Sequence, residues 1–197
     1  PNHVRALRLL ARSARRSGDR ERAAAHMQAA CRSDSASADA VVELAGDLLA
    51  LDRLEASEAH ARTAVALSPV NYAALRILAQ IAKRQGHVST CLEIGRTGWA
   101  EGAGPDQAGF DLAADLRTAG QWDEALGVIT VLSDRPSARA DAMVERAQLA
   151  RRFDGVSSAR EFLFEALKTN PSHPRALLFL GDLDRETGDL DGADTFY

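Results

Sequence analysis

The stretch from Pro171 to Ala193, PSHPRALLFLGDLDRETGDLDGA, has the pattern of a helix, a tight turn and a second helix. Leucines follow its opening proline at helical spacing, and Thr187-Gly188-Asp189 interrupts the pattern. A second copy of the opening lies at the N-terminus, where PNHVRAL at 1–7 matches PSHPRAL at 171–177. The offset between the two copies is five times 34. The stretch therefore predicts one module that repeats along the chain with a period of 34.

The register of this repeat follows from stepping along the chain by one period at a time, starting from Val4. It gives modules at 4–37, 38–71, 72–105, 106–139 and 140–173 and an incomplete module at 174–197, and residues 1–3 are expected to end a preceding module. Small residues recur at module position 8 (Ala11, Ala45, Ala79, Ala113, Ala147, Gly181) and at position 20 (Ala23, Ser57, Cys91, Ala125, Ala159, Ala193). Two antiparallel helices approach closely only where one of them presents a small side chain. The pattern therefore predicts a close pair of helices in each module.

The turn inside each module is predicted at position 15, which is glycine in four modules: Gly18, Gly86, Gly120 and Gly188. Glycine is favoured where a helix ends in the left-handed conformation. Asp52 suits this conformation less well, and in the fifth module Gly155 can replace Asp154. All six prolines fall at module junctions and none falls inside a helix. This agreement of core, turn and breaker positions indicates a helical repeat array.

A period of 34, with leucine at position 7 and small residues at positions 8, 20 and 27, resembles the tetratricopeptide repeat. Position 7 is leucine in every module except the fifth, where it is Arg146, and position 27 is alanine at Ala30, Ala64 and Ala166. The tryptophan that the family usually has at position 4 is missing. The resemblance covers the whole chain. It implies an all-α, right-handed superhelical α-solenoid of helix-turn-helix repeats.

The third module departs from the pattern. Its second helix contains Gly95 and Gly98 and runs into GWAEGAGP at 98–105. Each glycine costs roughly 1 kcal/mol relative to alanine inside a helix. Two explanations stay open: a locally loose junction that Trp99 fills, or a functional hinge over 95–105.

Composition and charge argue against several classes of function. The chain has 28 acidic and 24 basic residues, and a net charge of −4 gives no general attraction to nucleic acid. No apolar run approaches the roughly 18 residues of a membrane span, so no membrane insertion is expected. Cys31 and Cys91 are expected to be reduced thiols. The five histidines have no metal-ligand spacing, and no phosphate-binding or nucleophile motif occurs. We therefore expect no enzyme activity, no metal and no cofactor.

The resemblance implies that the first helices of the modules line a concave groove. Candidate partner-binding residues at the positions that face it are Arg5, Arg8, Arg12, Arg15, Arg16, Arg76, Gln80, Lys83, Phe110, Arg117 and Arg151. Position 12 is basic in five of the six modules, and two explanations stay open. These cations can complement the dipole at the C-terminal end of each first helix, or they can bind an acidic or C-terminal peptide. The five arginines of the first module exceed what a dipole requires.

Two binding modes known in the family do not fit these residues. The carboxylate clamp for chaperone tails wants asparagine where the second module has Glu43, whose charge would repel a carboxylate. The asparagine ladder of O-GlcNAc transferase wants asparagine at position 6 of each module, where this chain has Leu9, Glu43, Ile77, Asp111, Glu145 and Phe179.

We therefore expect a non-catalytic scaffold that binds a protein or peptide segment in the groove. Two alternatives stay open: a regulatory or substrate-recruiting region of a larger enzyme, such as a glycosyltransferase or sulfotransferase, and a part of an envelope or polysaccharide-export assembly. A cytoplasmic location is favoured, and a periplasmic one stays open because the sequence before Pro1 is missing. The last module lacks most of its second helix, so Leu177, Phe179, Phe196 and Tyr197 are expected to be partly exposed and to allow self-association.

Overall fold

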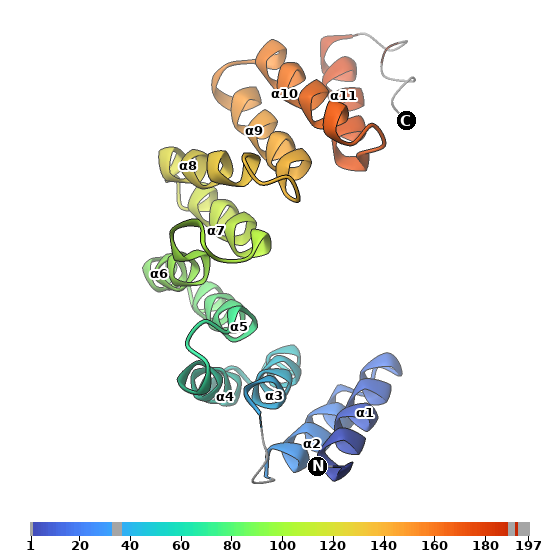
Figure 1. Ribbon diagram of the computed structural model, residues 1–197, viewed down its shortest axis with the longest axis vertical. Helices are drawn as coiled ribbons and strands as arrows, with labels where there is room; N and C mark the ends of the chain where they lie inside the picture. Colours follow the sequence, from blue (N-terminus) through green and yellow to red (C-terminus); the bar gives the residue numbers. More distant parts are fainter. Residues whose placement is uncertain (1, 33–36, 189–191, 193–197) are drawn as a thin grey trace. The chain divides into compact units, whose positions relative to one another are not determined.

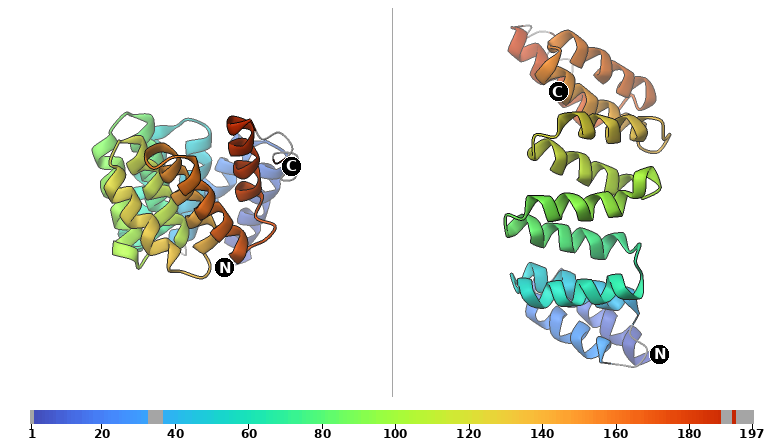
Figure 2. Two further views of the ribbon diagram at one scale, coloured as in Figure 1. Left: turned by 90° about the horizontal axis from the view of Figure 1, so that it is seen from above. Right: turned by 90° about the vertical axis from the view of Figure 1, so that its left-hand side faces the viewer.

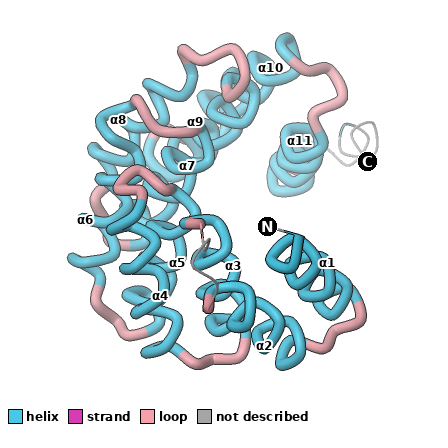
Figure 3. The backbone as a smooth tube through the Cα atoms, turned by 60° about the horizontal axis from the view of Figure 1, so that its bottom comes forward, coloured by secondary structure: helices cyan, strands magenta, loops and turns pink. Residues whose placement is uncertain are grey.

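The computed structural model describes residues 2–32, 37–188 and 192. These residues form eleven α-helices and a short 3-10 helix, η1, and the described part of the chain contains no strand (Figures 1 and 3). The elements are α1 (Asn2–Arg16), α2 (Arg20–Cys31), α3 (Ala38–Ala50), α4 (Leu54–Leu67), α5 (Tyr72–Arg84), α6 (Val88–Trp99), η1 (Ala100–Gly102), α7 (Asp106–Thr118), α8 (Trp122–Ser133), α9 (Arg139–Phe153), α10 (Val156–Thr169) and α11 (Pro174–Thr187). The predicted fold class, an all-α solenoid of helical hairpins, is confirmed.

The helices follow the predicted register, with two small differences at helix starts. Helix α1 begins at Asn2, two residues before the expected start of its module at Val4. Helix α9 begins at Arg139, just before the expected start of its module at Ala140. Several first turns are closed by a side chain: Asp19 and Asn71 accept hydrogen bonds from backbone N–H groups three residues ahead.

The chain divides into two compact units, Pro1–Ala108 and Gly109–Tyr197, where the sequence predicted one array. The boundary lies in α7, shortly after the glycine-rich stretch 95–105. In the first unit each helix from α1 to α6 packs on the next, and in the second unit the same holds from α8 to α11 (Figure 2). Each unit is thus a short stack of helical hairpins.

Each described hydrophobic cluster includes the first helix of a following module. One cluster joins Met27 of α2 to Ala11 of α1 and Leu44 of α3. In the second unit, Leu163 of α10 packs with Met143 of α9 and Leu180 of α11 in the same way. A module therefore buries its apolar side only when its neighbour is present, as expected for a repeat array.

The small residues lie where the two helices of a module approach each other. Ala11, Ala45 and Ala147, at position 8, are fully buried. In the second module Ser57, at position 20, donates a hydrogen bond of 2.7 Å from its Oγ to the carbonyl oxygen of Ala45. A larger side chain at either position would separate the helices, because this contact reaches from side chain to backbone.

The predicted turn conformation is confirmed at position 15. Gly18, Gly86, Gly120 and Gly188 have φ between 75° and 82°, and Asp52 also adopts a positive φ, of 59°. In the fifth module the turn residue with a positive φ is Gly155, at φ 98° and ψ −178°. This conformation is essentially restricted to glycine.

The glycine-rich junction is a closely packed turn. Trp99 is buried and ends α6, and the N–H of Gly104 donates a hydrogen bond of 2.9 Å to the Trp99 carbonyl oxygen. A Cβ on Gly104 would lie 2.3 Å from the carbonyl oxygen of Gly98 and 2.9 Å from that of Trp99. A Cβ on Gly98 would meet only the Tyr72 and Leu75 side chains, at ordinary contact distances. Of these two glycines, Gly104 is required by packing and Gly98 is not.

Replacing two glycines of the second unit separates backbone strain from packing. A Cβ on Gly155 or Gly127 meets no atom within 4 Å, but only Gly155 has a positive φ. Gly155→Ala should destabilise the unit by about 1–3 kcal/mol. Gly127→Ala, inside α8, should stabilise it by about 1 kcal/mol. Urea unfolding followed by circular dichroism measures both, and equal effects would contradict the strained turn.

The junction allows a matched test in the first unit. Gly104→Ala should destabilise the unit by about 2 kcal/mol, because its Cβ collides with backbone oxygens that cannot move independently. Gly98→Ala should be neutral or stabilising by up to about 1 kcal/mol. Thermal unfolding of the two variants measures the contrast. If Gly104→Ala is tolerated as well as Gly98→Ala, the junction is looser than its packing indicates.

Candidate functional site

The first helices of the Pro1–Ala108 unit, α1, α3 and α5, lie on one side of the unit, and α2, α4 and α6 lie on the other (Figure 1). We call the surface of α1, α3 and α5 the first-helix face. It carries eight of the candidate residues: Arg5, Arg8, Arg12, Arg15, Arg16, Arg76, Gln80 and Lys83. The other three, Phe110, Arg117 and Arg151, lie on α7 and α9 in the second unit.

Two of the α1 arginines are held by acidic side chains of α3. Arg15 binds Asp47 through two hydrogen bonds, of 2.6 Å from Nε and 2.7 Å from Nη2, and its Nη1 lies 3.0 Å from Oε2 of Glu43. Arg8 donates to the other Glu43 oxygen from both Nε and Nη2. This paired geometry is the strong form of arginine–carboxylate contact. Arg8 and Arg15 therefore fasten α1 to α3.

The pKa values of this cluster reflect the pairing. Burial alone would raise the pKa of Glu43, but the hydrogen bonds and charges of Arg8 and Arg15 outweigh it and lower that pKa below its ordinary value. The hydrogen bond to Asp47, partly offset by burial and reinforced by Glu43, raises the pKa of Arg15. Two arginines face two carboxylates, so the formal charges of the cluster cancel.

The same arrangement recurs in the second unit. Arg117 of α7, at position 12, lies 2.6 Å from Glu145 and donates to Gln148 at 2.7 Å, both on α9. Arg151, also at position 12, donates to Glu186 of α11. Arg15, Arg117 and Arg151, all at position 12, thus bind polar residues on the first helix of the next module. The sequence predicted the basic residues at position 12 but did not predict that they pair with the next module. The signal that could have indicated this pairing is the acidic residue at position 6, Glu43 and Glu145.

The other candidate residues differ in exposure and in partners. Arg5, Arg12, Arg16 and Arg76 are exposed and form no ion pair with any residue that the structure describes. Gln80 and Lys83 are exposed, and Phe110 is half-buried.

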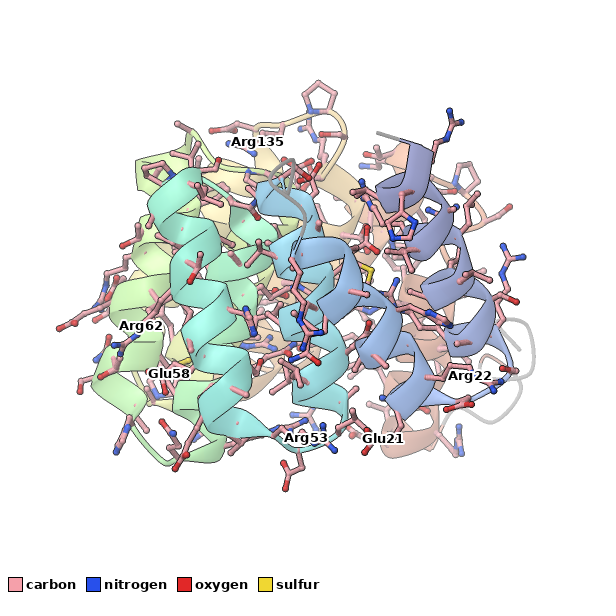
Figure 4. The ribbon with its side chains drawn as sticks, turned by 90° about the horizontal axis from the view of Figure 1, so that it is seen from below. Glu21, Arg22, Arg53, Glu58, Arg62 and Arg135 are labelled. Atoms are coloured by element: carbon pink, nitrogen blue, oxygen red, sulfur yellow. The ribbon has the colours of Figure 1, made fainter. Side chains whose placement is uncertain are left out.

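Ion pairs also join modules on the opposite side of the first unit. Arg53, just before α4, binds Glu21 of α2, with Nη2 lying 2.9 Å from Oε1 (Figure 4). Both side chains are about half exposed, so the pair contributes little, on the order of 0.5 kcal/mol.

Several expected features concern other parts of the surface. Cys31 and Cys91 form no disulfide, and burial, with a contribution from Glu43, raises the pKa of Cys31. Leu177 and Phe179 are half-buried on α11, and Phe196 and Tyr197 lie outside the described residues.

Within the described ranges, no group of three or more metal-ligating side chains occurs, and no helix has the length and apolar character needed to cross a bilayer.

Comparison with known proteins agrees with the repeat geometry. Residues 145–196 match the family model of the tetratricopeptide repeat. The match covers the end of α9, α10 and α11, so this part of the chain is similar to the tetratricopeptide repeat. No curated protein matches the sequence significantly.

Solved tetratricopeptide repeat structures share the fold of the chain. A tetratricopeptide repeat protein from Parabacteroides merdae is 14% identical, with a TM-score of 0.73, over 100% of this chain and 78% of its own. PilF from Pseudomonas aeruginosa is 18% identical, with a TM-score of 0.72, over 99% of this chain and 89% of its own. YrrB, described as having an unusual peptide-binding site, is 20% identical, with a TM-score of 0.59, over 85% of this chain and 86% of its own.

The α1–α3 ion pairs predict a pH-dependent stability. Glu43→Gln should destabilise the first unit by about 1 kcal/mol at neutral pH, a value that allows for solvent screening. Because the pKa of Glu43 is lowered on folding, its contribution is complete above the ordinary glutamate pKa of about 4.3 and is lost as the pH falls through the lowered value. The difference from wild type should therefore be smaller at pH 3 than at pH 7.

Urea unfolding at both pH values measures this difference. Glu93→Gln, which removes an exposed charge on α6, is the control and should change stability little at either pH. A Glu43→Gln effect that is the same at both pH values would contradict the role of the paired charge.

Proposed function

We propose that this tetratricopeptide repeat protein is a non-catalytic scaffold that binds an acidic peptide or protein segment on its first-helix face. The proposal rests on one observation: Arg5, Arg12 and Arg16 are exposed on α1 without an ion pair among the described residues, while Arg8 and Arg15 are paired.

The spacing of these three arginines favours binding along the helix. Arg5 and Arg12 are seven residues apart, and Arg16 follows four residues later. At about 100° per residue, these intervals bring all three side chains to one stripe of α1. Arg8 and Arg15 point away from this stripe, toward α3, where their acidic partners lie. The stripe is therefore a row of three guanidinium groups without an ion pair among the described residues.

The charge of the neighbouring helix also favours an acidic partner. Glu43 and Asp47 of α3 are neutralised by Arg8 and Arg15, so Glu43 presents no net repulsion to a carboxylate. Arg76, exposed on α5, adds a further positive charge to the same face. Guanidinium groups suit carboxylates because they offer forked donors.

The proposal is tested by fluorescence anisotropy with a labelled peptide rich in aspartate and glutamate. A twin peptide has every acidic residue replaced by its amide. The acidic peptide should bind, and its affinity should fall as salt is added. Arg12→Gln combined with Arg16→Gln should weaken binding by about tenfold, which corresponds to two partly exposed ion pairs. Both positions are chosen because their side chains are exposed and form no ion pair with a described residue.

The matched control removes two exposed arginines from the second helix of the same module. Arg20→Gln combined with Arg22→Gln lowers the net charge equally but leaves the α1 stripe intact. Binding should then change by less than about twofold. Equal weakening by the two double variants, or equal binding of the amide twin, would show that only general electrostatic attraction operates.

A further inference from the structure

A cavity of about 650 Å³ lies in the second unit, apart from the first-helix face. It is bordered by the start of α8, the C-terminal half of α9 and Phe162 of α10. Its apolar walls include Trp122, Leu126 and Phe153, and the last two are 41% and 57% exposed. Trp122 and Phe153 meet edge to face, with ring centroids 5.5 Å apart. A cavity of this size can hold a few side chains of a peptide.

Arg146 lines this cavity at the module position that holds leucine everywhere else in the chain. Of the equivalent leucines, Leu44, Leu112 and Leu180 are buried, whereas Leu10 in the first module is 50% exposed. Arginine in their place puts a charge at a site that the repeat reserves for an apolar side chain. The substitution therefore calls for an explanation that packing does not supply.

The guanidinium of Arg146 lacks a polar partner within the described part of the chain. Its carbon lies 4.6 Å from the centre of the Phe162 ring, so the group is stacked on an aromatic face. Its Nε is buried and donates no hydrogen bond to any described residue, and Arg146 forms no ion pair with one either. A buried donor without an acceptor costs about 1–3 kcal/mol. Stacking fixes the plane of the group and leaves its forked donors unused.

We propose that this cavity binds a peptide segment in which one carboxylate side chain lies between apolar residues. The carboxylate accepts hydrogen bonds from the Arg146 guanidinium. The flanking apolar side chains cover Leu126 and Phe153, which are exposed, beside the half-buried Trp122. The site thus differs in position and in ligand chemistry from the arginine stripe of α1.

The acidic residues around the cavity explain why one carboxylate is preferred over many. Asp123, Glu124 and Asp154 also line it. They repel a polyacidic segment, and Arg146 accommodates a single negative charge. An acidic peptide suited to the α1 stripe is therefore a poor ligand for this cavity.

The test is an NMR titration with acetyl-Leu-Glu-Phe-amide and its twin acetyl-Leu-Gln-Phe-amide. The indole N–H signal of Trp122, assigned by its loss in Trp122→Phe, reports binding. The glutamate peptide should shift this signal and bind at least about tenfold more tightly than the glutamine peptide. Equal affinities of the twins, or no shift at millimolar peptide, would overturn the proposal without any variant of Arg146.

Variants then test the role of Arg146. Arg146→Leu restores the residue of the other modules, so the melting temperature should be unchanged or raised while the preference for glutamate is lost. Arg146→Lys keeps the charge without the fork and should bind the glutamate peptide about fivefold more weakly. Arg139→Leu, the same change on the same helix but outside the cavity, should leave binding unchanged. Retention of the glutamate preference in Arg146→Lys and in any folded Arg146→Leu would overturn the proposal.

The proposals for the cavity and for the α1 stripe can be tested independently. Arg12→Gln combined with Arg16→Gln should not alter binding of the short glutamate peptide. Arg146→Leu should not alter binding of the polyacidic peptide. Loss of both activities in either variant would mean that a single site accounts for the two.

Discussion

The close approach of two helices at small side chains is the constraint on which the rest of this structure depends. Ala11, Ala45 and Ala147 have no exposed surface, and the Ser57 hydroxyl bonds directly to the backbone of Ala45. Such contacts fix how each hairpin closes. Because each cluster also needs the first helix of the next module, the hairpin geometry determines the spacing of successive modules.

That spacing determines which charged residues meet. With first helices held side by side, a basic residue at position 12 of one module reaches position 6 of the next, as in Arg15 with Glu43 and Arg117 with Glu145. Part of the positive charge of the first helices is therefore a structural component of the array. The number of arginines on these helices therefore exceeds the number that a partner can bind. The arginines that indicate a binding surface are those without an ion pair among the described residues.

The sequence predicted the fold closely because the residues that each turn and helix contact need recur in several modules. Gly18, Gly86 and Gly120 mark the same turn, and the transfer of that role to Gly155 followed from its neighbour Asp154. The division into two units at Ala108 and the tight packing of Gly104 could not be predicted, since both depend on backbone contacts that no repeated pattern encodes. Five arginines on α1 were predicted to face a ligand, but their spacing alone did not show that two of them bind α3.

Departures from the repeat carry information because the array itself does not require them. Most repeated residues are explained by packing, capping or ion pairing between modules, and substitutions there report on stability. Arg146 is different: leucine occupies the same position in the other five modules, and the arginine leaves a buried donor unbonded among the described residues, in a cavity that also contains the exposed Phe153. An arginine at a position that holds leucine in the other modules, and that lines a cavity of suitable size, is best understood through a ligand that binds its guanidinium group.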